Sequence, residues 1–259
     1  MKRLLKIIIR RNRNTKLMQL LRRLSDSFLM VLNCDDIIGH INLNGELRLM
    51  ETLSSEDKDG LTVFDVGANR GDWSSAWLRL TTLSNIYCFE VVKPVYEKLE
   101  KTLQNEGRVK CCHFGLSDGN FETEVAYLPN SDSGSSLNVL PWNQEMIRLP
   151  ATLRKGEDYV REQGIREIFF LKIDTEGHEF QVLLGMRSLL EKNRIKCIQF
   201  EYGYTYIQNS VFLKDIYEML RGYGCSIGCI YPEGINFKEY NVFKDEDFRM
   251  SNYFASCDS

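Results

Sequence analysis

Short apolar runs alternate with amphipathic stretches between residues 61 and 222. Runs of this kind, rich in Val, Ile and Phe, predict buried strands, whereas apolar residues at every third or fourth position predict helices that cover a sheet. Alternating strands and helices are typical of an α/β domain with a parallel sheet. The strands are expected at residues 61–65, 85–90, 108–113, 169–174 and 195–201, and the helices at residues 73–80, 93–105, 156–164, 180–192 and 212–222.

The alternation changes in two places. Residues 121–151 interrupt it with an apolar run at residues 121–128, which predicts an additional strand, and a loop rich in Ser and Gly at residues 131–138. The C-terminal part ends in strand-like runs that no helix separates, so an antiparallel pair is expected to close the edge of the sheet. These runs are residues 225–231, 240–243 and 252–257.

A glycine loop follows the first predicted strand, in the sequence FDVGANRGDWS at residues 64–74. Glycine at positions 67 and 71 lets the backbone approach a ligand closely, and the next helix points its free N–H groups to the same place. The spacing differs from G-x-G-x-x-G, which disfavours a dinucleotide. A plain strand-to-helix turn is the structural alternative.

Glu90 stands at the tip of the second predicted strand, about 20 residues after the glycine loop. A carboxylate in this position can accept hydrogen bonds from the two ribose hydroxyls of a nucleoside. The alternative is a side chain that only ends a strand and faces water. Together with the glycine loop, Glu90 favours an adenosyl ligand.

A second polar block, FFLKIDTEGHE, occupies residues 169–179. Strand alternation places Lys172 and Asp174 on one side and brings Asp174 to the edge at which the glycine loop opens. Glu176, His178 and Glu179 then crowd the start of the next helix. Acidic residues at a helix N-terminus are stabilising, so part of this block can be capping.

The glycine loop and the K-x-D-x-E-G-x-E pattern at residues 172–179 resemble the FkbM family of S-adenosylmethionine-dependent methyltransferases, over about residues 61–203. The resemblance implies a Rossmann-like, doubly wound, mostly parallel seven-stranded sheet with an antiparallel edge strand and helices on both faces. It implies S-adenosylmethionine as cofactor, an adenine contact after the third strand and a lid formed by residues 131–138. The expected cofactor-binding residues are Asp65, Gly67, Ala68, Asn69, Gly71, Glu90, Ser117 and Asp118.

Methyl transfer to a hydroxyl needs a base that removes the proton while the reacting atoms are held about 3–3.5 Å apart. Asp174, Glu176 and His178 are the candidates, and Asp174 is preferred, with Lys172 orienting it or the substrate. Glu201 ends the next strand and supplies another carboxylate. Since paired carboxylates suit Mg²⁺, Asp174 and Glu201 are also a candidate pair for sharing that ion.

The acceptor implied by the resemblance is a hydroxyl on a sugar of a glycan or glycolipid, or on a secondary metabolite such as a polyketide. Two other classes compete with a methyltransferase. A nicotinamide oxidoreductase uses a similar sheet, but it would need the glycine spacing that is absent. A non-catalytic, adenosyl-binding scaffold at a membrane surface would keep the glycine loop. The sequence leaves the oligomeric state open.

Charge is distributed unevenly along the 259 residues. The net charge is −3, which disfavours nucleic acid as a partner, but residues 1–24 carry nine basic and no acidic side chains. Leu17, Leu20, Leu21 and Leu24 have helical spacing. This arm either rests on an anionic membrane face or packs on the domain, and packing is the preferred interpretation. The expected organisation is a basic helical extension, residues 1–55, followed by a catalytic domain, residues 56–259.

Eight cysteines are scattered through apolar runs, without a C-x-x-C pair or a signal peptide. They are expected to be reduced core residues of a cytoplasmic protein, with peripheral contact at the inner membrane face as a further option. The three histidines are far apart in sequence, so no structural metal is expected.

Overall fold

Eight strands form the main sheet of the computed structural model, which describes residues 2–32, 37–129 and 146–257. The strands follow the apolar runs, because residues buried on both faces of a parallel sheet must be apolar. Their bounds are β1 (Thr62–Val66), β2 (Asn85–Phe89), β3 (Val109–Cys112), β7 (Ile168–Ile173), β8 (Ile195–Tyr202), β9 (Ser226–Tyr231), β10 (Gly234–Phe237) and β11 (Ser251–Ser256).

The strand order is β10-β9-β11-β8-β7-β1-β2-β3. Strands β3, β2, β1, β7 and β8 are parallel, and β11 pairs antiparallel with both β8 and β9. The chain runs outward from β1 to β3 and then returns to β7 on the other side of β1. Ligands of open α/β sheets bind at such a reversal, beyond the carboxyl ends of the strands.

This topology confirms the predicted fold class, with one additional strand. A tight hairpin after β9 forms β10, which is the antiparallel edge strand. The strand predicted at residues 240–243 is wrong. Asn241 instead accepts a hydrogen bond from the backbone N–H of Phe243 and starts the short helix α10 (Val242–Asp245).

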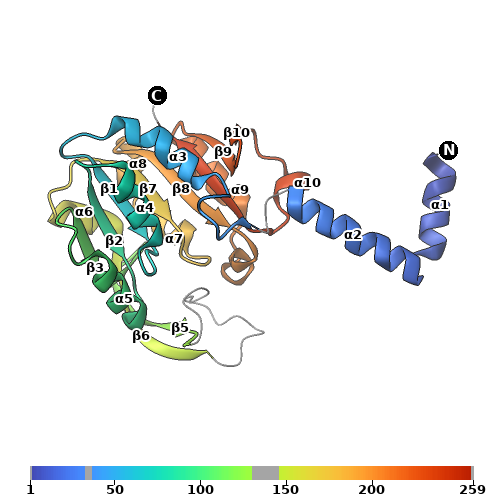
Figure 1. The fold of residues 1–259 in the computed structure, drawn as a ribbon, viewed down its shortest axis with the longest axis horizontal. Coiled ribbons are helices and arrows are strands. Elements are labelled where there is room, and N and C mark those ends of the chain that lie inside the picture. Colours follow the sequence, from blue (N-terminus) through green and yellow to red (C-terminus); the bar gives the residue numbers. More distant parts are fainter. Residues whose placement is uncertain (1, 33–36, 130–145, 258–259) are drawn as a thin grey trace.

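Helices cover both faces of the sheet, as Figure 1 shows. Because side chains alternate along a strand, Val63, Phe170 and Cys197 face one side, and Phe64, Leu171 and Ile198 face the other. The first face packs on α3 (Glu46–Leu53), α4 (Asp72–Leu80) and α5 (Lys93–Leu103). The second packs on α6 (Gly156–Glu162), α7 (Glu179–Leu184), α8 (Arg187–Glu191) and α9 (Leu213–Gly222).

A smaller sheet stands below the main one in Figure 1. It has the order β4-β6-β5, and β5 confirms the strand predicted at residues 121–128. The long β6 was not predicted from its mixed sequence. The lid expected at residues 131–138 lies outside the described residues. The three strands are β4 (Gly115–Ser117), β5 (Phe121–Tyr127) and β6 (Ile147–Lys155).

A disulfide joins Cys225 to Cys257, so the expectation that all cysteines are reduced is wrong. The antiparallel pairing of β9 with β11 places Ser226 opposite Ser256, and the two cysteines are the next pair in this register. Partners 32 residues apart in sequence gave no local signal. The free cysteines of the described residues are Cys88, Cys111, Cys112, Cys197 and Cys229.

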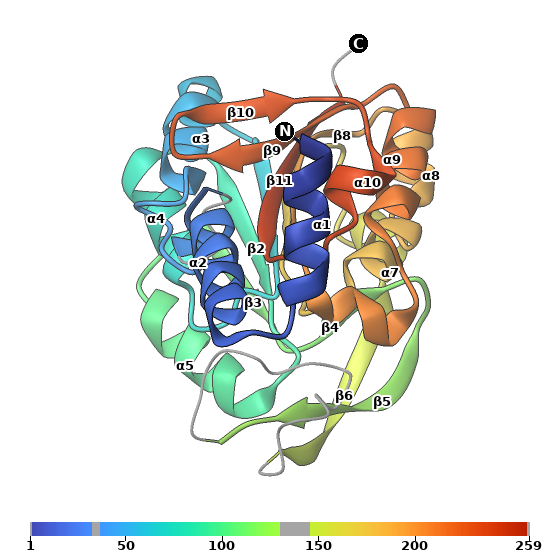
Figure 2. The same ribbon diagram turned by 90° about the vertical axis from the view of Figure 1, so that its right-hand side faces the viewer.

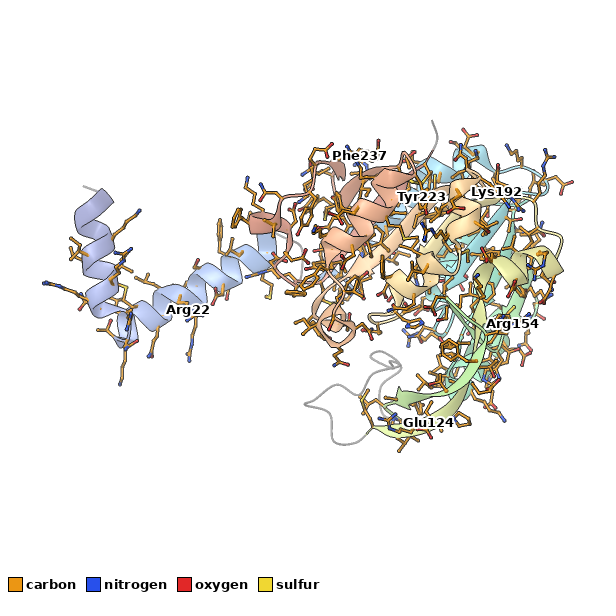
Figure 3. The ribbon with its side chains drawn as sticks, turned by 180° about the vertical axis from the view of Figure 1, so that it is seen from behind. Arg22, Glu124, Arg154, Lys192, Tyr223 and Phe237 are labelled. Carbon is orange, nitrogen blue, oxygen red and sulfur yellow. A yellow bond between two sulfur atoms is a disulfide. The ribbon has the colours of Figure 1, made fainter. Side chains whose placement is uncertain are left out.

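The N-terminal arm consists of α1 (Lys2–Asn12) and α2 (Lys16–Leu32) and projects away from the sheet (Figures 1 and 2). Its helical spacing was predicted correctly, but packing on the domain, which was the preferred interpretation, is wrong because α2 has no buried residue. In Figure 3, Arg22 lies on the part of the arm that stands clear of the body. Among the described helices, none has the length and the apolar character needed to cross a membrane.

Candidate active site

A cavity of about 1010 Å³ opens at the carboxyl ends of β1, β2, β7 and β8. It lies where the strand order reverses between β1 and β7. Many of the residues predicted for the site line it, and these come from both the cofactor-binding and the catalytic sets. They are Gly67, Ala68, Asn69, Glu90, Lys172, Asp174, Glu176, His178 and Glu201.

The other predicted site residues support the wall from behind or lie beside it. Asp65 is fully buried beneath the cavity, and Gly71 precedes the first turn of α4. Ser117 is buried behind the wall, whereas Asp118 is exposed. From that part of the chain, Gly115 and Leu116 reach the cavity instead.

Lys172 connects the carboxylates of two neighbouring strands. Its Nζ lies 3.2 Å from Asp65 Oδ1 and 3.4 Å from Asp174 Oδ2, and it donates a hydrogen bond to Gly67 O at 3.3 Å. Burial alone would lower the pKa of Lys172, but the neighbouring carboxylates, Asp65 first, hold that pKa well above its usual value. Lys172 is therefore a permanent cation under the cavity floor.

Asp65 is held on its other side by Ser74 of α4, whose Oγ donates a 2.7 Å hydrogen bond to Asp65 Oδ2. The buried pair of Asp65 and Lys172 thus links β1, β7 and α4. Removing one member of such a pair leaves an uncompensated charge in the core. In this geometry Asp65 positions the loop and the lysine, and does not face the cavity.

The glycine loop is shaped by two close approaches. Gly67 has φ 77°, and a Cβ at this position would lie 1.8 Å from the carbonyl oxygen of Asp174. The backbone N–H groups of Gly67 and Ala68 both donate to Phe89 O at 3.0 Å. At Gly71, with φ 91°, a Cβ would press on Leu99 of α5. The loop therefore joins the ends of β1, β2 and β7 and requires glycine at both positions.

Glu90 is oriented by the backbone. Its Oε2 accepts from the N–H of Asn69 at 3.0 Å, and its Oε1 accepts from the N–H of Val92 at 2.8 Å. Burial raises the pKa of Glu90 to about 7, although both backbone donors and Lys172 favour the ionised form. The carboxylate thus lies on the cavity wall in a fixed orientation, where a ribose can donate to it.

Acidic side chains crowd the cavity above β7 and β8. Asp174 is partly exposed there. Burial, followed by the nearby charges of Asp174 and Glu176, raises the pKa of Glu201 well above its usual value. A raised pKa favours the protonated form, and a protonated Glu201 can donate a hydrogen bond, whereas a carboxylate can only accept one.

Glu179 shapes the turn that carries Glu176. Its Oε1 accepts hydrogen bonds from the backbone N–H and the Oγ1 of Thr175 and from the N–H of Gly177, at 2.7, 3.0 and 3.2 Å. Glu176 takes the left-handed conformation, with φ 54°. Burial raises the pKa of Glu179 to about 7. Part of the predicted acidic block is therefore structural, as the capping alternative proposed.

His178 lines the cavity and lies next to Ser117. Its Nε2 is 2.9 Å from Ser117 Oγ, and that hydroxyl also donates to Asp118 Oδ1 at 3.0 Å. Burial lowers the pKa of His178 to about 4, against the opposing effect of Asp118. The imidazole is therefore neutral at pH 7, and its affinity for a proton is low.

Two polar residues on the wall were missed in the sequence. Glu46, at the start of α3, accepts from Asn252 Nδ2 at 3.0 Å and from Gln199 Nε2 at 2.6 Å, and both Glu46 and Asn252 reach the cavity. Burial raises the pKa of Glu46. The available signal was a carboxylate at the start of an amphipathic helix. One partner, Asn44, is two residues away, but Gln199 and Asn252 lie more than 150 residues away in sequence.

In the described ranges, no three His, Cys, Asp or Glu side chains are grouped so that they could hold a metal ion. The suggestion that Asp174 and Glu201 share Mg²⁺ therefore has no support in the arrangement of the side chains.

Comparison with known proteins connects this geometry to a reaction. The model of the methyltransferase FkbM domain matches residues 65–227. Hexuronic acid methyltransferase AglP of Haloferax volcanii is 23% identical over 163 residues, which are 62% of this chain and 65% of AglP. The chain thus matches slightly less than two thirds of that relative. The 2-O-methyltransferase NoeI of Sinorhizobium fredii is 19% identical over 200 residues, 71% of this chain and 80% of NoeI.

Among solved structures, methyltransferase FkbM from Methylobacillus flagellatus KT superposes with a TM-score of 0.48 at 14% identity, over 76% of this chain and 44% of that one. The assignment of the fold rests on the strand order described above and not on this likeness.

Proposed function

Because the chain belongs to the FkbM family of S-adenosylmethionine-dependent methyltransferases, we propose that it methylates a hydroxyl group of a sugar in a glycan or glycolipid. The names of AglP and NoeI, a hexuronic acid methyltransferase and a 2-O-methyltransferase, support a sugar and an oxygen acceptor. The single observation that carries the proposal is a cavity with a fixed carboxylate, Glu90, at β2 and a group of acidic side chains at β7 and β8.

The cofactor half of the cavity is formed by the ends of β1 and β2. The glycine loop, residues 67–71, offers its backbone to the cofactor, and Glu90 accepts from the ribose hydroxyls. The cofactor supplies an electrophilic methyl group on a sulfonium. Asp65 and Lys172 hold the loop in place from below. The adenine contact expected from Ser117 and Asp118 stays a prediction. From the same segment, Leu116 lies on the cavity wall.

The acceptor half lies over β7 and β8. The hydroxyl oxygen of the acceptor attacks the methyl carbon as the carbon–sulfur bond breaks, and the hydroxyl proton passes to the carboxylate of Asp174. Lys172, whose Nζ lies 3.4 Å from Asp174 Oδ2, orients that carboxylate before the transfer. Glu176 and His178 are the alternative bases, and burial lowers the pKa of His178 to about 4, which weakens the imidazole as a base at neutral pH.

Glu201 has a different role in this proposal. Burial, followed by the nearby carboxylates, raises its pKa, which favours the protonated carboxyl, and in that form it can donate a hydrogen bond to an acceptor oxygen. A pyranose offers several hydroxyls within reach of such a donor and of the neighbouring acceptors. Asn252 and Glu46 extend the polar wall in the same direction. This density of polar groups favours a sugar over an apolar polyketide, which is the second candidate acceptor.

The proposed organisation is a basic N-terminal extension joined to a catalytic domain at about residue 55, at the cytoplasmic face of a membrane. Helix α3, which ends at Leu53, already packs on the sheet through Met50. The extension in the strict sense is therefore the arm of α1 and α2.

The proposal is tested with S-adenosylmethionine carrying a labelled methyl group and a panel of acceptors: neutral hexosides, hexuronosides and a phenolic polyketide. The expected result is transfer of the label to a sugar. The label should resist mild alkali, because a methyl ether survives this treatment. Label released as methanol would identify a carboxyl ester of a hexuronic acid. Transfer to the polyketide alone would overturn the sugar assignment.

A further inference from the structure

Helix α2 carries one continuous apolar face that the body of the protein leaves exposed. At 100° per residue, seven large apolar side chains fall in a sector of about 120°. Each of them is between 48% and 64% exposed, which is unusual for so many neighbouring apolar residues in a folded chain. They are Leu17, Leu20, Leu21, Leu24, Phe28, Val31 and Leu32.

The remainder of the helix surface is mixed, with three basic residues, four other polar residues and the three apolar residues Met18, Leu29 and Met30. Arg22 and Asp26 lie opposite the apolar sector, 3.9 Å apart, and Lys16 and Arg23 lie nearer its borders. Asp26 is the one acidic residue of the first 32, which include nine Lys and Arg residues. An apolar sector bordered by cations is typical of a helix that lies in the interface of an anionic membrane.

The charge also distinguishes between the possible occupants of this face. A second copy of the chain would bring the same positive charges together, and like charges oppose such a pairing. A bilayer with anionic lipids offers the opposite charge, and each Lys or Arg near its surface contributes about 1 kcal/mol.

We propose that α2 lies in the plane of an anionic membrane, with its apolar sector inserted among the lipids and its basic residues at the head groups. The inference concerns the arm and does not depend on the identity of the acceptor. It extends the membrane contact expected for residues 1–24 to Leu32 and identifies the inserted side chains. Ile7, Ile8 and Ile9 of α1 are exposed as well.

The connection to the active site gives this surface a role. The chain reaches the cavity wall at Ile38, six residues after Leu32, and continues along it to Leu43. Six residues span at most about 20 Å. A membrane-bound α2 would therefore keep the cavity close to the lipid surface, where the sugar of a lipid-linked acceptor is found.

The test is sedimentation of the full-length protein with two kinds of vesicle. One consists of phosphatidylcholine alone, and the other also contains about 30% of the anionic lipid phosphatidylglycerol. Binding to the anionic vesicles that weakens as salt is raised is the expected result. The triple variant Leu20→Gln, Leu24→Gln, Phe28→Gln should lower the partition coefficient at least about tenfold, since each substitution replaces an inserted apolar side chain by a polar one.

A matched control carries the same substitution outside the sector: Met18→Gln, Leu29→Gln, Met30→Gln. It should change the partition coefficient by less than about threefold. Equal losses in both triple variants would overturn the proposed orientation. Failure of the wild-type protein to bind anionic vesicles would overturn the membrane contact itself. A dimer in sedimentation velocity that only the sector variant disrupts would assign the face to a second copy. Binding of S-adenosylhomocysteine, measured in parallel, reports separately on the proposed activity.

Discussion

The carboxylates in the two halves of the cavity have different surroundings. In the cofactor half, Asp65 is bonded to Ser74 and Lys172, and Glu90 receives two backbone N–H groups, so each has a fixed orientation. In the acceptor half, Asp174 is partly exposed, and Glu201 shares its surroundings with other carboxylates that raise its pKa. The first arrangement suits a ligand that is always the same. The second suits proton transfer and leaves room for acceptors that vary.

Lys172 and Gly67 connect the halves. The Lys172 ammonium reaches a carboxylate on each side, and the backbone of Gly67 lies against that of Asp174. A change at either connection is expected to affect both halves, whereas a change within one half should leave the other intact. The following substitutions test whether the two halves can be changed separately.

Asp174→Asn should have the largest effect, on turnover alone. Loss of a general base lowers kcat by roughly 10²- to 10⁴-fold, while the affinity for S-adenosylhomocysteine should stay within about threefold of wild type. Methyl-transfer kinetics and a binding titration check the two parts. Asp59→Asn, in the exposed turn before β1, is the control. A parallel loss of cofactor affinity in Asp174→Asn would contradict the division into halves.

Gly67→Ala should disturb both halves together. The added Cβ would meet the carbonyl of Asp174 in a backbone conformation that alanine disfavours, so the free energy of unfolding should fall by about 3 kcal/mol or more. Urea unfolding measures this change. Gly60→Ala is the matched control, because Gly60 has φ 80° but no atom within 4 Å of a Cβ. It should lose only the conformational cost of about 1–2 kcal/mol. Similar losses in both variants would show that the close approach is not needed.

Glu179→Gln tests the burial of the acidic turn through its pH dependence. The folded protein holds the Glu179 proton up to a pKa of about 7, against 4.5 as the ordinary value. Folding therefore binds a proton between these pH values, and this group makes the free energy of unfolding fall as pH rises from 4.5 to 7. The variant lacks this loss, so relative to wild type it should gain about 3 kcal/mol from pH 4.5 to pH 8.

Urea unfolding of both proteins at the two pH values measures that difference, in which the other titrating groups cancel. Parallel pH profiles for wild type and Glu179→Gln would mean that Glu179 is ionised in the fold at all these pH values.

Glu46→Gln should have the smallest effect, about 1 kcal/mol or less of unfolding free energy. Gln199 has a buried Oε1 without a partner, so it can turn its amide and accept from the new side-chain NH₂. Glu46→Ala is the comparison and should cost about 2–3 kcal/mol, because Asn252 and Gln199 then lose their acceptor. Thermal unfolding ranks the two, and equal destabilisation would contradict this view of the polar wall.

Local patterns were enough to predict the centre of the fold. The strand, the glycine loop and the following helix at residues 61–80 each depend on neighbours in sequence, as do Glu90 and the block at residues 172–179. Period-2 alternation correctly placed Lys172 and Asp174 on one side of β7. The sequence also predicted the helical spacing of the arm.

Features that depend on distant pairing could not be predicted in this way. The Cys225–Cys257 disulfide and the polar group of Glu46, Gln199 and Asn252 exist because strands that are far apart in sequence meet in one register. Asp65 stands next to the glycine loop, where the sequence predicts a cofactor contact. Local sequence gave no sign that this side chain is buried and paired with Lys172, and the cofactor contact stays a prediction. The exposure of α2 likewise depends on the absence of a complementary apolar face, which no local pattern records.

The most direct test of the two-half account is isothermal titration of S-adenosylhomocysteine into wild type, Glu90→Ala and Asp174→Asn, with Glu97→Gln on the exposed side of α5 as control. The account predicts micromolar binding by wild type and the control, a loss of at least about tenfold in Glu90→Ala, and nearly unchanged binding in Asp174→Asn. Folded wild type that binds nothing, or two active-site variants that lose affinity equally, would contradict it.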